Sequence, residues 1–323
     1  MKQLWVFLFP LILASCTQSH LNDQVVSQKY IHKYGFELDK EEWAQRDQDG
    51  RIEQYLDSGI KVVKSYREGY LHGITSYTYP YSATVEKTLV YDEGELVKET
   101  IHDRKGMPIQ QKNYLSEEEK MITYWSELGS PLRVETYQQG LLNEGLYYNA
   151  ANELEGKVEN GTGVRYKRMR DGTLIGMDDI QEGALVKRIS YHPNGKEHII
   201  SYFQDYLLQG KQEIYTPEGN LYMVNEWDDG LLHGKKLAYR DGRLIIATNY
   251  RYGKKEGIET RFDAYGKLLS EVAYQDDERH GLSQYYGARN KVKEEWFYRG
   301  KPTTTERFDI LTSKDLLIAN IDE

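Results

Sequence analysis

The side chains able to do covalent, metal or acid–base chemistry in this 323-residue chain are one cysteine, eight histidines and several groups of adjacent carboxylates. A single cysteine, Cys16, excludes an intramolecular disulfide and a thiolate metal cluster. Three histidines, His72, His233 and His280, each stand directly before a glycine. If they recurred once per pair of strands, their rings would lie about 9–10 Å apart, whereas the histidine ligands of one metal ion lie about 2 Å from it. We therefore predict no metal site and interpret these histidines as turn residues.

Adjacent carboxylates could share acid–base catalysis if two of them flanked a substrate. They occur at 117–119, 228–229 and 276–277, where loops or turns are expected and where aspartate helps the backbone to bend. The nucleophile elbow Gly-x-Ser-x-Gly, the phosphate loop, His-Glu-x-x-His and Gly-x-Gly-x-x-Gly do not occur in the sequence. We therefore expect no catalytic residues and no cofactor, and we do not expect the chain to be an enzyme.

Composition and charge narrow the class of protein further. The chain has 42 basic and 51 acidic residues, a net charge of −9, which disfavours a nucleic-acid partner because phosphate binding needs a clustered basic surface. Hydrophobic residues make up 39% of the chain, below the roughly 45–50% of an average globular protein, so a thin core is expected. The 28 tyrosines and 28 glycines, with only 7 prolines, are typical of a repeated turn-and-strand unit.

The N-terminus has the features of a secretory signal, with Lys2 followed by an apolar run from Leu4 to Leu13 that is too short to span a bilayer. The segment Leu13-Ala14-Ser15-Cys16 resembles the lipobox of bacterial lipoproteins. That resemblance implies cleavage before Cys16, acylation of Cys16, and attachment to the cell envelope through two or more acyl chains. Thr17, in place of an aspartate, implies the outer membrane if the host is Gram-negative. An ordinary signal peptide with an incidental cysteine is the alternative.

Aromatic residues recur along the chain at a nearly fixed interval. Their steps are 25, 23 and 23 residues, then a gap of 66, then 24, 23, 24 and 23. The gap holds roughly two degenerate units, one of them marked by 180–183 and 191–195. We call these aromatic residues the anchors and interpret them as a cross-strand core, with binding of a partner as the alternative; they are Tyr66, Tyr91, Tyr114, Tyr137, Phe203, Trp227, Tyr250, Tyr274 and Phe297.

Each unit contains two turn signals separated by short β-prone stretches. Gly and Asn tolerate positive φ and recur every 11–13 residues, and stretches such as 267–274 are β-prone and too short for stable helices. The pattern predicts an all-β fold, an elongated antiparallel β-meander of about ten 23–24-residue two-stranded repeats. The glycines assigned to the turns of the repeat are Gly69, Gly73, Gly210, Gly234, Gly257 and Gly281.

Short helices are predicted to cap both ends of the array. Asp39 and Glu42 form the sequence pattern of a capping box, which would place Trp43 as a lid over the first repeat, and 312–319 predicts a second short helix. The predicted division is 1–15 signal peptide, 16–50 tether and N-terminal cap, 51–300 repeat array, and 301–323 C-terminal cap.

The pattern Tyr-x-x-Gly, His-Gly, Tyr-x-x-Gly, as in 227–242 and 250–266, resembles MORN repeats and, more closely, the MORN-variant repeats of the bacterial YwqK-like family. The resemblance covers 51–300. It departs from the standard MORN unit because His233-Gly234 is not followed by a further Gly-x-Gly, so the phospholipid binding ascribed to some MORN proteins is not carried over. YwqK-like proteins often carry an antitoxin label.

The predicted function is that of a lipid-anchored envelope protein that acts as a non-catalytic scaffold for a protein partner. Its membrane contact would be the N-terminal lipid, and no nucleic-acid partner is expected. Three alternatives remain. The chain could bind a surface glycan through exposed tyrosines such as Tyr81, Tyr252 and Tyr265; it could be an antitoxin-like inhibitor in the cytoplasm; or it could hold an enzymatic site in the irregular stretch 154–179.

Overall fold

The computed structural model describes residues 23–287 and 291–319. The predicted signal peptide and Cys16 lie outside this part of the chain. The structure divides into two units, one ending at Met107 and the other beginning at Pro108, which are described separately. The strand pairs within both units are antiparallel, and most strands pair with the strand that follows them in the sequence. The predicted antiparallel β-meander with helical caps is therefore confirmed.

The first unit is a sheet in which β1 pairs with both β2 and β3, followed by the successive pairs up to β8. Residues 25–30 were predicted to belong to a tether, whereas the structure places them in β1, hydrogen-bonded along the length of β3. Backbone pairing does not depend on apolar side chains, which is why this polar segment joins the sheet. The elements are β1 (25–32), β2 (37–38), α1 (40–45), β3 (50–56), β4 (61–67), β5 (70–71), β6 (73–78), β7 (85–92) and β8 (95–102).

Helix α1 caps this unit as the sequence predicts. The Asp39 side chain accepts a hydrogen bond from the Glu42 backbone, and the Glu42 side chain reaches back to the Asp39 backbone, forming a capping box. Trp43 is 5% exposed, with its ring 5.7 Å from that of Tyr30 and 6.1 Å from that of Tyr66. The helix thus covers the first anchor.

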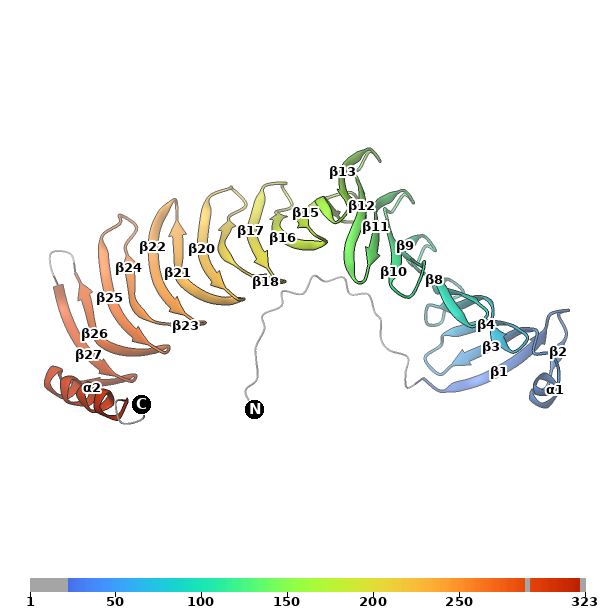
Figure 1. Ribbon diagram of the computed structural model, residues 1–323, viewed down its shortest axis with the longest axis horizontal. Helices are drawn as coiled ribbons and strands as arrows, with labels where there is room; N and C mark the ends of the chain where they lie inside the picture. The colour runs from blue at the N-terminus through green and yellow to red at the C-terminus, as the bar shows by residue number, and fades with distance from the viewer. Residues whose placement is uncertain (1–22, 288–290, 320–323) are drawn as a thin grey trace. The chain divides into compact units, whose positions relative to one another are not determined.

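The second unit is one continuous meander from β9 to β28, whose strands succeed one another in chain order in Figure 1. Its elements are β9 (108–114), β10 (119–125), β11 (131–138), β12 (141–148), β13 (154–159), β14 (162–168), β15 (174–181), β16 (184–191), β17 (197–204), β18 (207–208), β19 (210–215), β20 (221–228), β21 (231–240), β22 (243–251), β23 (254–255), β24 (257–262), β25 (268–275), β26 (278–286), β27 (291–298), β28 (301–303) and α2 (305–319).

The hairpin turns explain the glycine spacing. After every anchor-bearing strand except β9, the two central turn residues both have positive φ, as in Asp229-Gly230 and Tyr252-Gly253, which is the type I′ geometry that matches strand twist. Gly69 occupies such a turn. The other predicted turn glycines instead begin or interrupt a strand, each at positive φ. All five stand directly opposite an anchor of the next anchor-bearing strand, the pairs being Gly73–Tyr91, Gly210–Trp227, Gly234–Tyr250, Gly257–Tyr274 and Gly281–Phe297.

Helix α2 begins seven residues before the predicted start at Thr312. Thr304 accounts for the difference, because its hydroxyl accepts from the Arg307 N–H at 3.3 Å and its carbonyl from the Phe308 N–H at 2.9 Å, capping an extra helical segment. The Phe308 ring packs 5.1 Å from those of His280 and Trp296. The helix therefore covers the last repeat.

Candidate binding face

The anchors of the second unit all project from one face of its sheet. Residues directly opposite in antiparallel strands, and residues two apart along a strand, share a face, and this relation links the anchors through the strand registers. We call it the anchor face. Its anchors are Tyr114, Tyr137, Phe203, Trp227, Tyr250, Tyr274 and Phe297, while Tyr66 and Tyr91 lie on β4 and β7 of the first unit.

The gap in the anchor spacing is filled by aliphatic residues. Val158 on β13 and Ile180 on β15 occupy the anchor position, at steps of 21, 22 and 23 residues between Tyr137 and Phe203. They are 1% and 3% exposed and form a core cluster with Leu142 and Tyr147. The stretch 154–179 is therefore regular sheet built from shorter repeats.

Glycines make room for the tyrosines of this cluster. The Tyr147 ring lies over Gly145, where any added Cβ would overlap the hydroxyl, and the Tyr166 ring lies over Gly156 in the same way. At Gly163 a Cβ would overlap the backbone carbonyl of Lys157. Sequence reasoning missed these positions because strand glycines look like turn glycines when only their spacing is known.

A row of mostly polar residues runs across the anchor face beside the anchors. On a strand that carries an anchor, the residue of this row stands two positions before the anchor, as Asp178 does before Ile180. On the strands in between, the row is continued by the residues that lie directly opposite. We call it the polar row; it comprises Arg165, Asp178, Arg188, Ser201, Gln212, Asn225, Lys236, Thr248, Glu259, Val272 and Ser283. A polar residue that recurs two positions before most anchors, with Leu89 and Val272 as exceptions before Tyr91 and Tyr274, is the sequence signal that could have revealed it.

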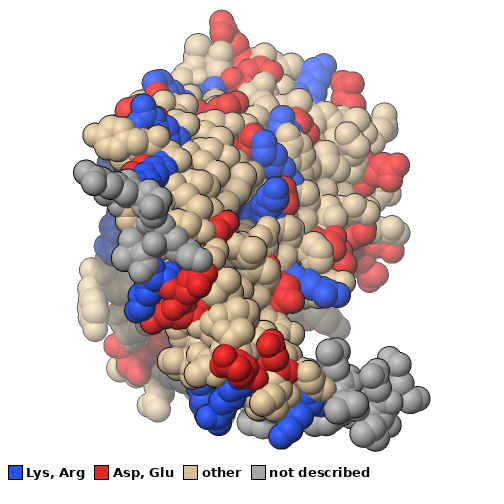
Figure 2. Space-filling view, turned by 90° about the vertical axis from the view of Figure 1, so that its left-hand side faces the viewer, with Lys and Arg blue, Asp and Glu red and all other residues tan. Residues whose placement is uncertain are grey.

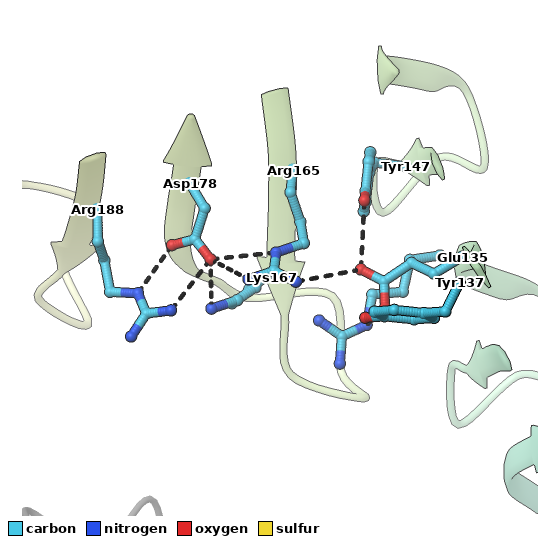
Figure 3. Close-up of polar contacts among 8 residues, drawn as sticks. Glu135, Tyr137, Tyr147, Arg165, Lys167, Asp178 and Arg188 are labelled. Carbon is cyan, nitrogen blue, oxygen red and sulfur yellow. Dashed lines mark hydrogen bonds and ion pairs between the residues drawn. The ribbon is translucent and has the colours of Figure 1, made fainter. Parts of the chain in front are cut away.

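At one end of the polar row, Asp178 is surrounded by three cations (Figure 3). It is fully buried and accepts hydrogen bonds from Arg188 Nε at 2.8 Å and Arg165 Nε at 3.1 Å, with Lys167 Nζ 2.6 Å away. Burial alone would raise the pKa of Asp178, but the Arg188 hydrogen bond and the charges of Lys167 and Arg165 outweigh it and hold the pKa well below its usual range. The carboxylate stays ionised.

Arg165 connects this group to a second buried carboxylate. Its Nη1 lies 3.9 Å from Glu135 Oε1, and Glu135 is 1% exposed. The hydroxyls of Tyr137 and Tyr147 donate to Glu135 at 3.0 and 3.2 Å, and Figure 3 shows the bond from Tyr147. Burial, and then the adjacent Glu135 charge, raise the pKa of both tyrosines, so they remain neutral donors. An anchor thus takes part in a buried polar network that the sequence did not indicate.

The excess of cations around Asp178 predicts an alkaline effect on stability. Burial lowers the pKa of Lys167 from 10.5 to about 8, because attraction by Asp178 only partly offsets it and Arg165 and Arg188 repel the ammonium. Between about pH 8 and 10 the folded chain gives up this proton while the unfolded chain keeps it, so stability rises with pH. As the pH rises across this window, we expect the unfolding free energy of wild type to increase by about 2 kcal/mol relative to that of Lys167→Met. Urea titrations of both proteins at several pH values would measure it, and a constant difference would contradict it.

A groove of about 620 Å³ lies over strands β20 to β24. Its floor includes Lys236, Thr248 and Glu259 of the polar row, with Met223 and Ile246 beside them. Glu259 is 2% exposed, and its carboxylate is already paired within the chain. Lys255 Nζ lies 2.6 Å away, Arg261 Nε donates at 2.9 Å and the Thr248 hydroxyl donates at 3.2 Å. Burial would raise the pKa of Glu259, but the hydrogen bonds from Lys255 and Arg261 lower it on balance.

The surface in Figure 2 carries basic and acidic side chains interspersed, without a broad area of one sign on this side of the molecule. Among residues 23–287 and 291–319, no group of three or more His, Cys, Asp and Glu side chains is placed to hold a metal ion. Over the same residues, neither helix has the length and apolar character needed to cross a membrane. The described arrangement offers hydrogen bonds, ion pairs and ring faces to a ligand.

Comparison with known proteins gives little further information. No family model matches the chain, and no curated protein does. Among solved structures, it is similar to a TcdB2-TccC3 chain at 12% identity and a TM-score of 0.20, covering 76% of this chain and 20% of that one. It is also similar to BamB from Moraxella catarrhalis at 9% identity and a TM-score of 0.15, covering 78% and 83%. The chain spans about a fifth of the TcdB2-TccC3 chain, and TM-scores this low carry no argument about function.

Proposed function

We propose that this chain is a lipid-anchored protein of the cell envelope that acts as a non-catalytic scaffold for a protein partner. The observation that carries the proposal is the anchor face, where a polar row and a row of anchors repeat side by side over strands β14 to β27. The half-buried members of these rows, among them Gln212, Lys236 and Tyr250, offer a partner several weak contacts that add up along the sheet. The lipobox-like segment ending at Cys16 supports attachment to the envelope.

The exposed tyrosines favour a protein partner over a glycan. Tyr252 and Tyr265 are 63% and 89% exposed, but Tyr252 stands in the turn before β23 and Tyr265 in the turn after β24. Two rings so placed do not form a platform for one sugar chain. Neither ring lines the groove over β20 to β24, where Tyr222, Tyr239 and Tyr250 stand among aliphatic side chains such as Met223 and Ile246.

The Cys16→Ala variant tests the anchor. We expect wild-type protein in the membrane fraction of its native cells, with an intact mass that corresponds to an acylated chain starting at Cys16. The variant should lose that mass and leave the membrane fraction, because the thiol that receives the lipid is absent. Wild-type protein that stays soluble and retains Met1 would contradict the anchor and would make the cytoplasmic inhibitor the leading hypothesis.

A further inference from the structure

The strongest unexplained feature of the anchor face is Lys236, a half-buried cation in the floor of the groove. Its directly opposite neighbours in the polar row are Asn225 and Thr248, which are both neutral. Within the part of the chain that the structure describes, the Lys236 ammonium has no ion pair or hydrogen bond. The other cations of the row, Arg165 and Arg188, both bind Asp178.

The nearest carboxylate along the row is not available to Lys236. Glu259 lies two strands away, about 9–10 Å across the sheet, and is already held by Lys255 and Arg261. The remaining acidic residues along the groove, Glu218 and Asp241, are exposed and stand in turns. An acidic group supplied from outside would therefore complete the row at Lys236.

An apolar strip runs beside Lys236 along the groove. Met223, Ala238 and Ile246 stand directly opposite one another on β20, β21 and β22, two residues along from the polar row. The small Ala238 between two larger side chains leaves a depression between them. On the other side of Lys236, the Tyr250 ring also lines the groove.

We propose that this groove binds a segment of the protein partner in which a carboxylate stands next to an aliphatic side chain. The carboxylate pairs with Lys236, and the aliphatic side chain packs against Met223, Ala238 and Ile246. The inference rests on the proposed function and specifies the chemistry of the partner. The aliphatic strip of Met223, Ala238 and Ile246 beside Lys236 favours a peptide that carries an aliphatic side chain next to its carboxylate over an acidic sugar.

Charge supports the same assignment. Four cationic side chains line the groove, Lys236, Arg240, Lys255 and Arg261, against three acidic ones. The whole chain carries a net charge of −9. The groove is therefore a locally positive site on an acidic protein, and it attracts an acidic segment that most of the remaining surface repels.

The test is a titration of the full chain with the acetylated, amidated peptide Leu-Glu-Leu-Glu-Leu and its Leu-Gln-Leu-Gln-Leu counterpart. We expect the acidic peptide to bind at least tenfold more tightly than the amide peptide, because only its carboxylate can form a charge-assisted hydrogen bond with Lys236. Lys236→Gln should remove that preference, while its fold is retained because no internal partner loses a contact. Lys293→Gln is the matched control, since Lys293 is 60% exposed on β27 and pairs with Glu295; it should change binding less than twofold.

Three outcomes would overturn the inference. The two peptides could bind equally, Lys293→Gln could weaken binding as much as Lys236→Gln, or a uronic-acid oligosaccharide could bind in a Lys236-dependent way while the acidic peptide does not. A photo-crosslinker at Ala238 distinguishes failure of the Lys236–carboxylate inference from failure of the proposed scaffold function. Capture of the same protein by wild type and Lys236→Gln with equal yield would refute the carboxylate pairing but leave the scaffold intact.

Discussion

Replacing Asp178 with asparagine is expected to lower the free energy of unfolding by about 3–5 kcal/mol, the usual cost of removing one partner from a buried ion pair. The three cations Arg165, Lys167 and Arg188 would lose the carboxylate around which they converge. Urea unfolding would measure the change. Amide hydrogen exchange should show the loss most strongly in β14 to β16, because each repeat is supported mainly by its neighbours.

Two comparisons make this prediction specific to the buried charge. Asp276→Asn removes an exposed carboxylate that pairs with Lys254 at 2.8 Å, and such surface pairs contribute about 0–1 kcal/mol. Combining Asp178→Asn with Lys167→Met removes one of the three cations that lack a carboxylate partner, and it should restore part of the lost free energy of unfolding. An effect of Asp178→Asn no larger than that of Asp276→Asn would show that the three cations do not depend on Asp178.

Replacing Tyr147 with alanine is expected to cost a similar amount, about 3–5 kcal/mol, the range measured for large aromatic residues in cores. Tyr147 has no exposed surface and packs with Leu142, Val158 and Ile180, and its hydroxyl donates to Glu135. The variant leaves a cavity at the place where the anchors are aliphatic and fill less volume. Chemical denaturation followed by tryptophan fluorescence would measure the loss.

The Tyr147→Phe variant separates the ring from the hydroxyl. It keeps the packing and removes one hydrogen bond to the buried Glu135 carboxylate, so we expect a loss of about 1.5–3 kcal/mol. Tyr265→Ala serves as the surface control, because Tyr265 is 89% exposed, and should change stability by less than about 0.5 kcal/mol. If Tyr147→Phe were as harmful as Tyr147→Ala, ring packing would not be the source of the stability.

The fold could be predicted from sequence because its determinants are local. Type I′ turns need residues that tolerate positive φ, such as Asp229-Gly230, and one anchor per pair of strands gives a visible period. The period is lost between Tyr137 and Phe203, since the anchor position there holds Val158 and Ile180. Their size and type do not distinguish them from ordinary strand residues.

The candidate site could not be predicted in the same way. The polar row is formed by residues of different types, such as Asp178, Asn225 and Thr248, which share only their position relative to the anchors. Strand register decides that they face the same side, and register depends on bulges that one sequence does not specify. The free charge of Lys236 is visible only after the neighbours in that register are known.

The most direct test of the scaffold function is site-specific photo-crosslinking in the native cells, with the crosslinker at Ala238 or at Lys235. Both positions lie on β21, Ala238 on the anchor face and Lys235 exposed on the opposite face. We predict a defined protein adduct from Ala238, absent from Lys235 and reduced in the Cys16→Ala background, where the chain is no longer held beside its partner. An anchor face that yields no protein adduct, at Ala238 or at other positions along the polar row, would contradict the proposal that this chain is a scaffold for a protein partner.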